Sequence, residues 1–214
     1  AFKFIEPEKD TSQLRIPRKI TLNGKKWDFE ELLEADKTTA FLIIHKDTLI
    51  YENYFYKYDE GTPHTSFSVA KSFVSALLGI AISEGHIKSV DEPITNYLKF
   101  KNKGFDKITI QHVLNMRSGI SFNESYVNPF GDVAKHYYGR NLEKYIENLK
   151  IETEPDQGFR YISINTQLLA SIIEKATGKP IYQYLEEKIW KPLGMEFEST
   201  WSVDSKKNNT AKAF

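Results

Sequence analysis

The sequence contains no cysteine and no excess of charge of either sign. Without cysteine the chain has no disulfide bonds, no thiolate zinc ligands and no cysteine nucleophile. Lysine and arginine together number 29, as do aspartate and glutamate, so the composition favours neither nucleic acid nor an anionic membrane surface as a partner. No apolar run approaches the ~20 residues that a membrane-spanning helix needs.

The motifs of several common enzyme classes are also missing. The chain has no Gly-x-Ser-x-Gly, no Walker loop and no Gly-x-Gly-x-x-Gly, which argues against α/β-hydrolase, nucleotide and dinucleotide sites. The histidines show neither an i, i+4 pair nor His-Glu-x-x-His, so we expect no metal ion and no other cofactor. His112 is expected to be structural. The expected partner is a small molecule, and the oligomeric state stays open.

A serine and a lysine stand just before the most apolar stretch of the chain, which runs from Phe73 to Ile82. Ser68 and Lys71 are three residues apart, so a helix would place them one turn from each other on one face. The free N–H groups and the dipole of a helix start favour negative charge there. Such a hydroxyl becomes a nucleophile if a desolvated, neutral amine takes its proton. The alternative is a capping serine and a solvated lysine.

β-rich runs come early in the chain. Residues 39–45 and 49–55 predict a hairpin of two strands, and the first strand is expected to be buried on both faces because it is nearly all apolar. A long helix is expected from about residue 66 or 68 to residue 84, with Gly85 as its stop. Gly79 inside that helix indicates close packing.

Several shorter elements follow. Helices are expected at 110–116, capped by Thr109, and at 142–149, 164–176 and 181–190, with a short one beginning at 91–93. Residues 120–140 read as a loop whose aromatic side chains are expected to pack rather than to line a pocket: Tyr126, Phe130, Tyr137 and Tyr138.

The end of the sequence looks like a cap and the first turn of a helix, at residues 208–214. A hairpin of two strands is marginal in water without further strands. We therefore expect the natural chain to continue past Phe214 and its tail to supply the missing strands.

Four further segments agree with the Ser68–Lys71 pair: Ile108–Ile120, Gln157–Ser163 with Asn165–Gly178, Ile189–Glu196, and Ser199–Trp201. The order and spacing of these segments resemble those of serine hydrolases of the class C β-lactamase and penicillin-binding-protein superfamily. The resemblance covers roughly residues 40 to 214. The chain resembles most the branch of 6-aminohexanoate-dimer hydrolases and related esterases. That branch carries Tyr-x-Ser where class C β-lactamases carry Tyr-x-Asn, and here Tyr161-Ile162-Ser163 is Tyr-x-Ser.

The resemblance implies an α+β, β-lactamase/transpeptidase-like fold with an antiparallel sheet flanked by helices, plus a helical subdomain. Residues 1–60 would be the N-terminal part of the α/β subdomain and residues 61–214 the helical subdomain. The C-terminal strands would lie outside this chain. The resemblance also implies that Ser68 is the acylated nucleophile, that Lys71 accepts its proton, and that Tyr161 transfers a proton to the leaving group. Ser163 would support the same cluster.

We therefore interpret the sequence as that of a serine hydrolase acting on amide or ester bonds through an acyl-enzyme. Esterase, amidase, β-lactamase and D-amino-peptidase activities all fit, and Tyr-x-Ser favours the first two. A third motif of the family, Lys- or His-x-Gly, is absent, so the 214 residues alone are expected to be poorly active. The alternative is a non-catalytic binding or sensor module. The location is open, with an extracytoplasmic one favoured over the cytoplasm.

Overall fold

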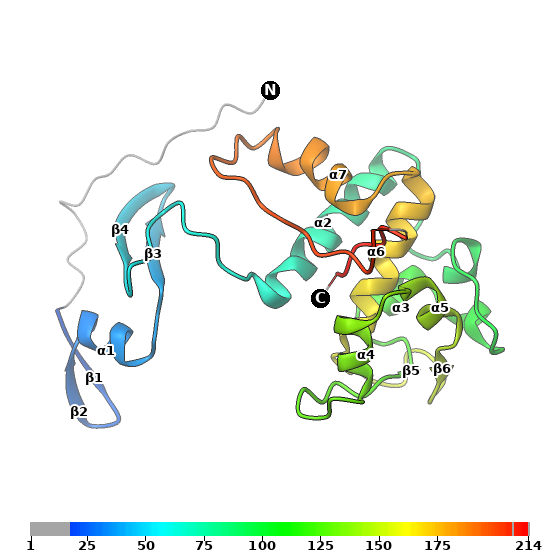
Figure 1. The fold of residues 1–214 in the computed structure, drawn as a ribbon, viewed down its shortest axis with the longest axis horizontal. Coiled ribbons are helices and arrows are strands. Elements are labelled where there is room, and N and C mark those ends of the chain that lie inside the picture. Colours follow the sequence, from blue (N-terminus) through cyan, green and yellow to red (C-terminus); the bar gives the residue numbers. More distant parts are fainter. Residues whose placement is uncertain (1–17, 207, 214) are drawn as a thin grey trace. The chain divides into compact units, whose positions relative to one another are not determined.

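The structure of the protein, a computed structural model, describes residues 18–206 and 208–213. The chain forms two compact units, which meet in the sequence between His64 and Thr65 (Figure 1). The first unit contains β1 (Lys19–Leu22), β2 (Lys25–Asp28), α1 (Phe29–Ala35), β3 (Ala40–His45) and β4 (Thr48–Tyr54). The second contains α2 (Ala70–Ser83), α3 (Ile110–Leu114), β5 (Ile120–Ser121), α4 (Asp132–Tyr138), α5 (Leu142–Glu147), β6 (Lys150–Ile151), α6 (Ser163–Thr177) and α7 (Ile181–Leu185).

The predicted hairpin of the first unit is formed by β3 and β4. The two strands are antiparallel, with Ala40 opposite Tyr54 at one end and His45 opposite Thr48 at the other. Lys46 and Asp47 make the turn with φ values of 49° and 62°. Two positive φ values suit the right-handed twist of the strands, which explains why so short a loop connects them.

The expectation that β3 is buried on both faces is wrong. Leu42 is 46% exposed and Ile44 is 63% exposed. The alternate residue Phe41 points to the other face, where its ring packs edge-on against those of Phe29 and Tyr51. Within the part of the chain that the structure describes, β3 pairs with β4 alone. The face of β3 that carries Leu42 and Ile44 is therefore exposed, whereas every residue of β4 is half-buried.

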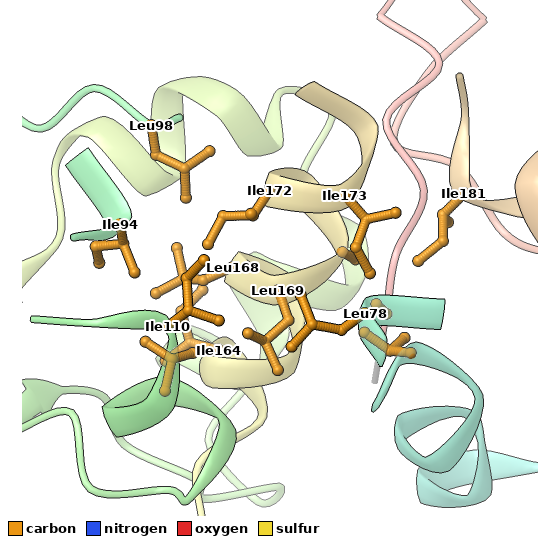
Figure 2. Packing of buried hydrophobic residues seen from close by; sticks show 14 of the residues in the cluster. Leu78, Ile94, Leu98, Ile110, Ile164, Leu168, Leu169, Ile172, Ile173 and Ile181 are labelled. Atoms are coloured by element: carbon orange, nitrogen blue, oxygen red, sulfur yellow. The ribbon is translucent and has the colours of Figure 1, made fainter. Parts of the chain in front are cut away.

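The second unit is organised around α6, which packs against α2, α3 and α7. All residues from Ser163 to Ile173 are buried, so the helix is enclosed on every side rather than on one face. Buried side chains from the surrounding elements gather around it (Figure 2). They include Leu78 of α2, Ile94, Leu98, Ile110 of α3, and Ile181 of α7. The polar side chains of α6 are bonded inside the unit: Asn165, for example, accepts a hydrogen bond from Ser118 Oγ at 2.7 Å.

The long predicted helix is α2, which continues directly from a 3₁₀ turn at Phe67–Val69. It ends at Ser83, one residue before the predicted end, with Glu84 as its C-cap and Gly85 following as predicted, with a φ of 78°. The prediction of close packing at Gly79 is wrong, because a Cβ built there would meet nothing within 4 Å.

Two other segments differ from the expectation. Residues 120–140, expected to be a loop, contain the helix α4 and the short strand β5. Residues 208–213, expected to begin a helix, instead run back along the chain, with Ala211 in an antiparallel bridge to Val203. Asn208 does not cap a helix: its side-chain amide donates to the carbonyl of Arg140 at 3.0 Å.

Gly119 occupies a place that no larger residue fits, and its replacement gives a test of this fold. Its φ is +72°, and a Cβ there would lie 2.2 Å from the carbonyl oxygen of Thr153 and 3.0 Å from that of Glu154. Both contacts are with backbone atoms, so no side chain can swing away. We expect Gly119→Ala to lower the free energy of unfolding by about 3 kcal/mol or more, measured by denaturant titration.

Gly178 is the matched control for this substitution. It ends α6 with a φ of +70°, but a Cβ there would meet nothing within 4 Å. Gly178→Ala should therefore cost only the backbone strain, about 1 kcal/mol. Equal losses for the two variants would contradict the packing described at Gly119.

Candidate active site

Ser68 and Lys71 lie together at the start of α2. The Nζ atom of Lys71 donates a hydrogen bond to Ser68 Oγ at 3.1 Å. Ser68 is exposed in the 3₁₀ turn, while Lys71 is half-buried in the first turn of α2. The hydroxyl is therefore open to a reacting molecule, and the amine is within direct reach of its proton.

The residue before Ser68 has an unusual backbone. Phe67 adopts a φ of 44°, in the left-handed region, although it is not a glycine and its side chain is 64% exposed. A bulky residue in that region costs on the order of 1–3 kcal/mol, which the surrounding structure must offset. The strain thus lies directly beside the hydroxyl that the Lys71 amine contacts.

The ring of Tyr161 lies beside the same amine. Lys71 Nζ is 5.4 Å from the centre of that ring, within the range of a cation–π contact. Tyr161 is 42% exposed, whereas Ile162 and Ser163, which follow it, are each only 2% exposed. The structure therefore brings Ser68, Lys71 and Tyr161 together, with Tyr161 at the point where the chain enters the core.

Arg160 anchors the segment that carries Tyr161. Its backbone N–H donates to the carbonyl of Met116 at 2.8 Å, and its guanidinium donates to the carbonyl of Phe122 at 3.0 Å and to the carboxylate of Glu152. These bonds attach the residue before Tyr161 to the end of α3 and to the segment after β5. No local pattern in the sequence marks Arg160, because most of its bonding partners are distant in the chain.

The fourth predicted residue, Ser163, is bonded to Glu124. Its Oγ donates to Glu124 Oε1 at 2.5 Å, and its backbone N–H donates to Glu124 Oε2 at 2.8 Å. The phenol of Tyr126 also donates to Glu124 Oε1, at 2.9 Å. Sequence reasoning missed Glu124, since a lone glutamate in a loop gives no signal of its own.

Several titratable groups share this environment. Burial raises the pKa of Tyr137, and the charges of Glu124, Tyr138 and Tyr161 add to the effect. Burial lowers the pKa of His136 to about 4; Lys212 and Lys71 act in the same direction, whereas a hydrogen bond with Gln167 and the carboxylate of Glu124 oppose it. His136 is therefore neutral at pH 7, and both Glu124 and Lys71 are close enough to act on it.

The aromatic side chains of residues 120–140 do not all pack as expected. Tyr126 is 64% exposed, and Phe130 and Tyr138 are each 83% exposed. Phe130 and Tyr138 line an open groove of about 530 Å³ between α4 and α5. None of the four predicted site residues lines this groove. His112 is structural, as expected, because its Nδ1 accepts the backbone N–H of Thr109 in the capping box of α3.

In residues 18–206 and 208–213, no three or more His, Cys, Asp or Glu side chains are grouped so that they could hold a metal ion. Among the helices that the structure describes, none combines the length and the apolar character needed to cross a membrane.

The β-lactamase/transpeptidase-like fold, with helices and small antiparallel sheets, is supported by comparison with known proteins. A solved structure from Bacillus anthracis, which carries the provisional name 6-aminohexanoate-dimer hydrolase, matches with a TM-score of 0.78 and 26% identity, covering 99% of this chain and 57% of that one. The profile of the Beta-lactamase family matches residues 29–214. The chain belongs to this family.

Two curated relatives match most of this chain in sequence. The 6-aminohexanoate-dimer hydrolase of Paenarthrobacter ureafaciens is 29% identical over 188 residues, which are 83% of this chain and 48% of that protein. The N-acetylmuramyl-L-alanine amidase of Bacillus subtilis is 29% identical over 198 residues, which are 78% of this chain and 44% of that protein. The chain spans about half the length of these relatives.

Proposed function

We propose that this sequence belongs to a serine hydrolase of the Ser-x-x-Lys type, which cleaves amide or ester bonds through an acyl-enzyme. The observation that carries the proposal is the 3.1 Å contact between Lys71 Nζ and Ser68 Oγ, with the ring of Tyr161 beside the same amine. Nucleophilic catalysis by serine needs a base at this distance and a third group near it. Membership of the Beta-lactamase family supports the proposal.

In the proposed reaction, the neutral amine of Lys71 accepts the proton of Ser68 while Oγ attacks the carbonyl carbon of the substrate. The tetrahedral intermediate then collapses, the bond to the leaving group breaks, and Tyr161 gives its phenolic proton to that group and takes up the proton that Lys71 holds. Water then attacks the resulting ester of Ser68 and loses a proton to Lys71. The bond to Ser68 Oγ breaks, Oγ takes that proton back from Lys71, and the acid is released. The backbone N–H of Ser68 would supply one donor to the developing oxyanion.

The substrate class that we propose first is an amide. The two curated relatives are named as a hydrolase of the 6-aminohexanoate dimer and as an amidase. The Tyr-x-Ser form of residues 161–163 also favours an amidase or an esterase over a β-lactamase. The net charge of the chain is zero and gives no preference for the charge of the substrate.

A fluorophosphonate probe tests the proposal directly, because it reacts with activated serine hydroxyls and stays attached. The complete natural polypeptide that carries this sequence should take up one probe molecule, and peptide mass spectrometry should place the adduct on Ser68. Heat-denatured protein is the control and should take up none. An adduct on a different serine, or no adduct on the folded protein, would contradict the proposal.

A further inference from the structure

The proposed mechanism leaves the carboxylate of Glu124 without a role, although it is bonded to Ser163, two residues after Tyr161. Three donors converge on it: the backbone N–H of Ser163 at 2.8 Å, the hydroxyl of Ser163 at 2.5 Å and the phenol of Tyr126 at 2.9 Å. Glu124 lies 39 residues before Ser163 in the chain and is half-buried.

Glu124 replaces a cap that α6 lacks. The residue at the N-cap position, Ile162, has no polar side chain and makes no capping bond. The first amide of the helix, that of Ser163, is one of those without a partner inside a helix. A carboxylate is the group that best suits this end, since it accepts the N–H and also complements the helix dipole. A residue from a distant loop therefore fixes the beginning of α6.

The position of Tyr161 depends on that same point of the chain. Tyr161 precedes Ser163 by two residues, and α6 is buried from Ser163 to Ile173, so little can move behind it. On the other side, Tyr161 is held through Arg160. Loss of the bonds to Glu124 would release one of the two attachments that keep the Tyr161 ring 5.4 Å from Lys71 Nζ.

We propose that Glu124 is a positioning residue of the active site, which acts through Ser163 to hold Tyr161 against Lys71. This proposal rests on the proposed hydrolase function. Ser163 is thereby assigned a connecting role, because both its hydroxyl and its backbone N–H donate to Glu124.

A double-mutant cycle on the complete polypeptide tests this connection. The second-order rate of Ser68 labelling by a fluorophosphonate is measured for E124Q, S163A and the double variant. We expect each single variant to react about 10- to 100-fold more slowly than the wild type, because each removes part of a charge-assisted network. The double variant should lie within about two-fold of the slower single variant, since both changes break one connection.

The pH dependence of the labelling rate shows whether a Glu124 variant is slow because the charge is lost or because the local structure is lost. Glu124 bonds Tyr126 on its own loop and acts electrostatically on His136 and Tyr137 of α4. The same two residues are also affected by Lys71 of α2 and by Tyr161 before α6, respectively. A carboxylate opposes proton loss from its neighbours. E124Q should therefore shift the rise of the labelling rate to lower pH, whereas E124D keeps the charge, loses reach, and should react slowly with the pH profile unshifted.

Glu143→Gln is the matched control. Glu143 is an exposed carboxylate of α5 that pairs with Lys175 at 2.9 Å, and its loss should leave the labelling rate unchanged. Circular dichroism checks that each variant folds; if E124Q does not, E124D carries the test. Labelling of E124Q and E124D at the wild-type rate, or strictly multiplicative losses in the cycle, would overturn the role of Glu124. A wild-type protein that is not labelled at Ser68 would instead overturn the hydrolase function, and with it this proposal.

Discussion

A Ser68→Ala variant of the complete polypeptide is expected to take up no fluorophosphonate and to form no acyl-enzyme with amide or ester substrates. The substitution removes the oxygen that Lys71 contacts at 3.1 Å and leaves no other nucleophile at that place. Because Ser68 is exposed, the change should not alter the stability of the fold by more than about 0.5 kcal/mol. Intact-mass measurement after labelling reads the result without any assumption about the natural substrate.

Ser66→Ala is the control for this loss. Ser66 stands two residues earlier, at the N-cap of the 3₁₀ turn, and its side chain makes no capping bond. It should be labelled at Ser68 at the wild-type rate. Labelling of the Ser68→Ala variant at the same stoichiometry as the wild type would remove Ser68 from the proposed role.

The second large effect is expected at Lys71. Lys71→Met keeps most of the side-chain volume but has no group that can accept the proton of Ser68. The labelling rate should fall by about 10²- to 10⁴-fold, which is the usual contribution of a general base. A neutral amine as base also predicts that the wild-type rate rises toward alkaline pH, and the variant should lose that rise. Stopped-flow or time-resolved mass measurement from pH 5 to pH 9 follows both.

Lys71→Arg distinguishes the charge of this residue from its basicity. An arginine places a positive charge next to Tyr161 that it keeps at every working pH, so it cannot accept a proton. It should therefore be as slow as the methionine variant. An arginine variant that reacts at the wild-type rate would show that Lys71 acts only as a cation.

The parts of the candidate site that the residue pattern predicts without the resemblance are those encoded locally. Ser68 and Lys71 are neighbours because of helical spacing alone, and the 3₁₀ turn that continues into α2 keeps that spacing. The position of Tyr161 relative to Lys71 followed only from the resemblance, since no local pattern connects two segments so far apart. The resemblance to the family therefore predicted a contact that helical periodicity cannot predict.

The features that were missed depend on long-range contacts. Glu124 is bonded to Ser163, 39 residues away, and nothing in the sequence around Glu124 indicates that bond. The helix α4 begins after Gly131, which supplies no side-chain cap, so the strongest start signal of a helix is missing from the sequence there. The strand β3 was expected to be buried on both faces because its residues are apolar. Apolar composition alone, however, does not determine which elements pack against a strand.

The enclosure of α6 has a consequence for how the site tolerates motion. Segments with many buried contacts open only with the whole unit, whereas exposed helix ends fray at little cost in free energy. Tyr161 directly precedes the buried helix α6, whereas Ser68 lies in the exposed 3₁₀ turn at the start of α2. Thermal motion therefore changes the distance between the two groups mainly by moving Ser68, while Tyr161 stays nearly fixed.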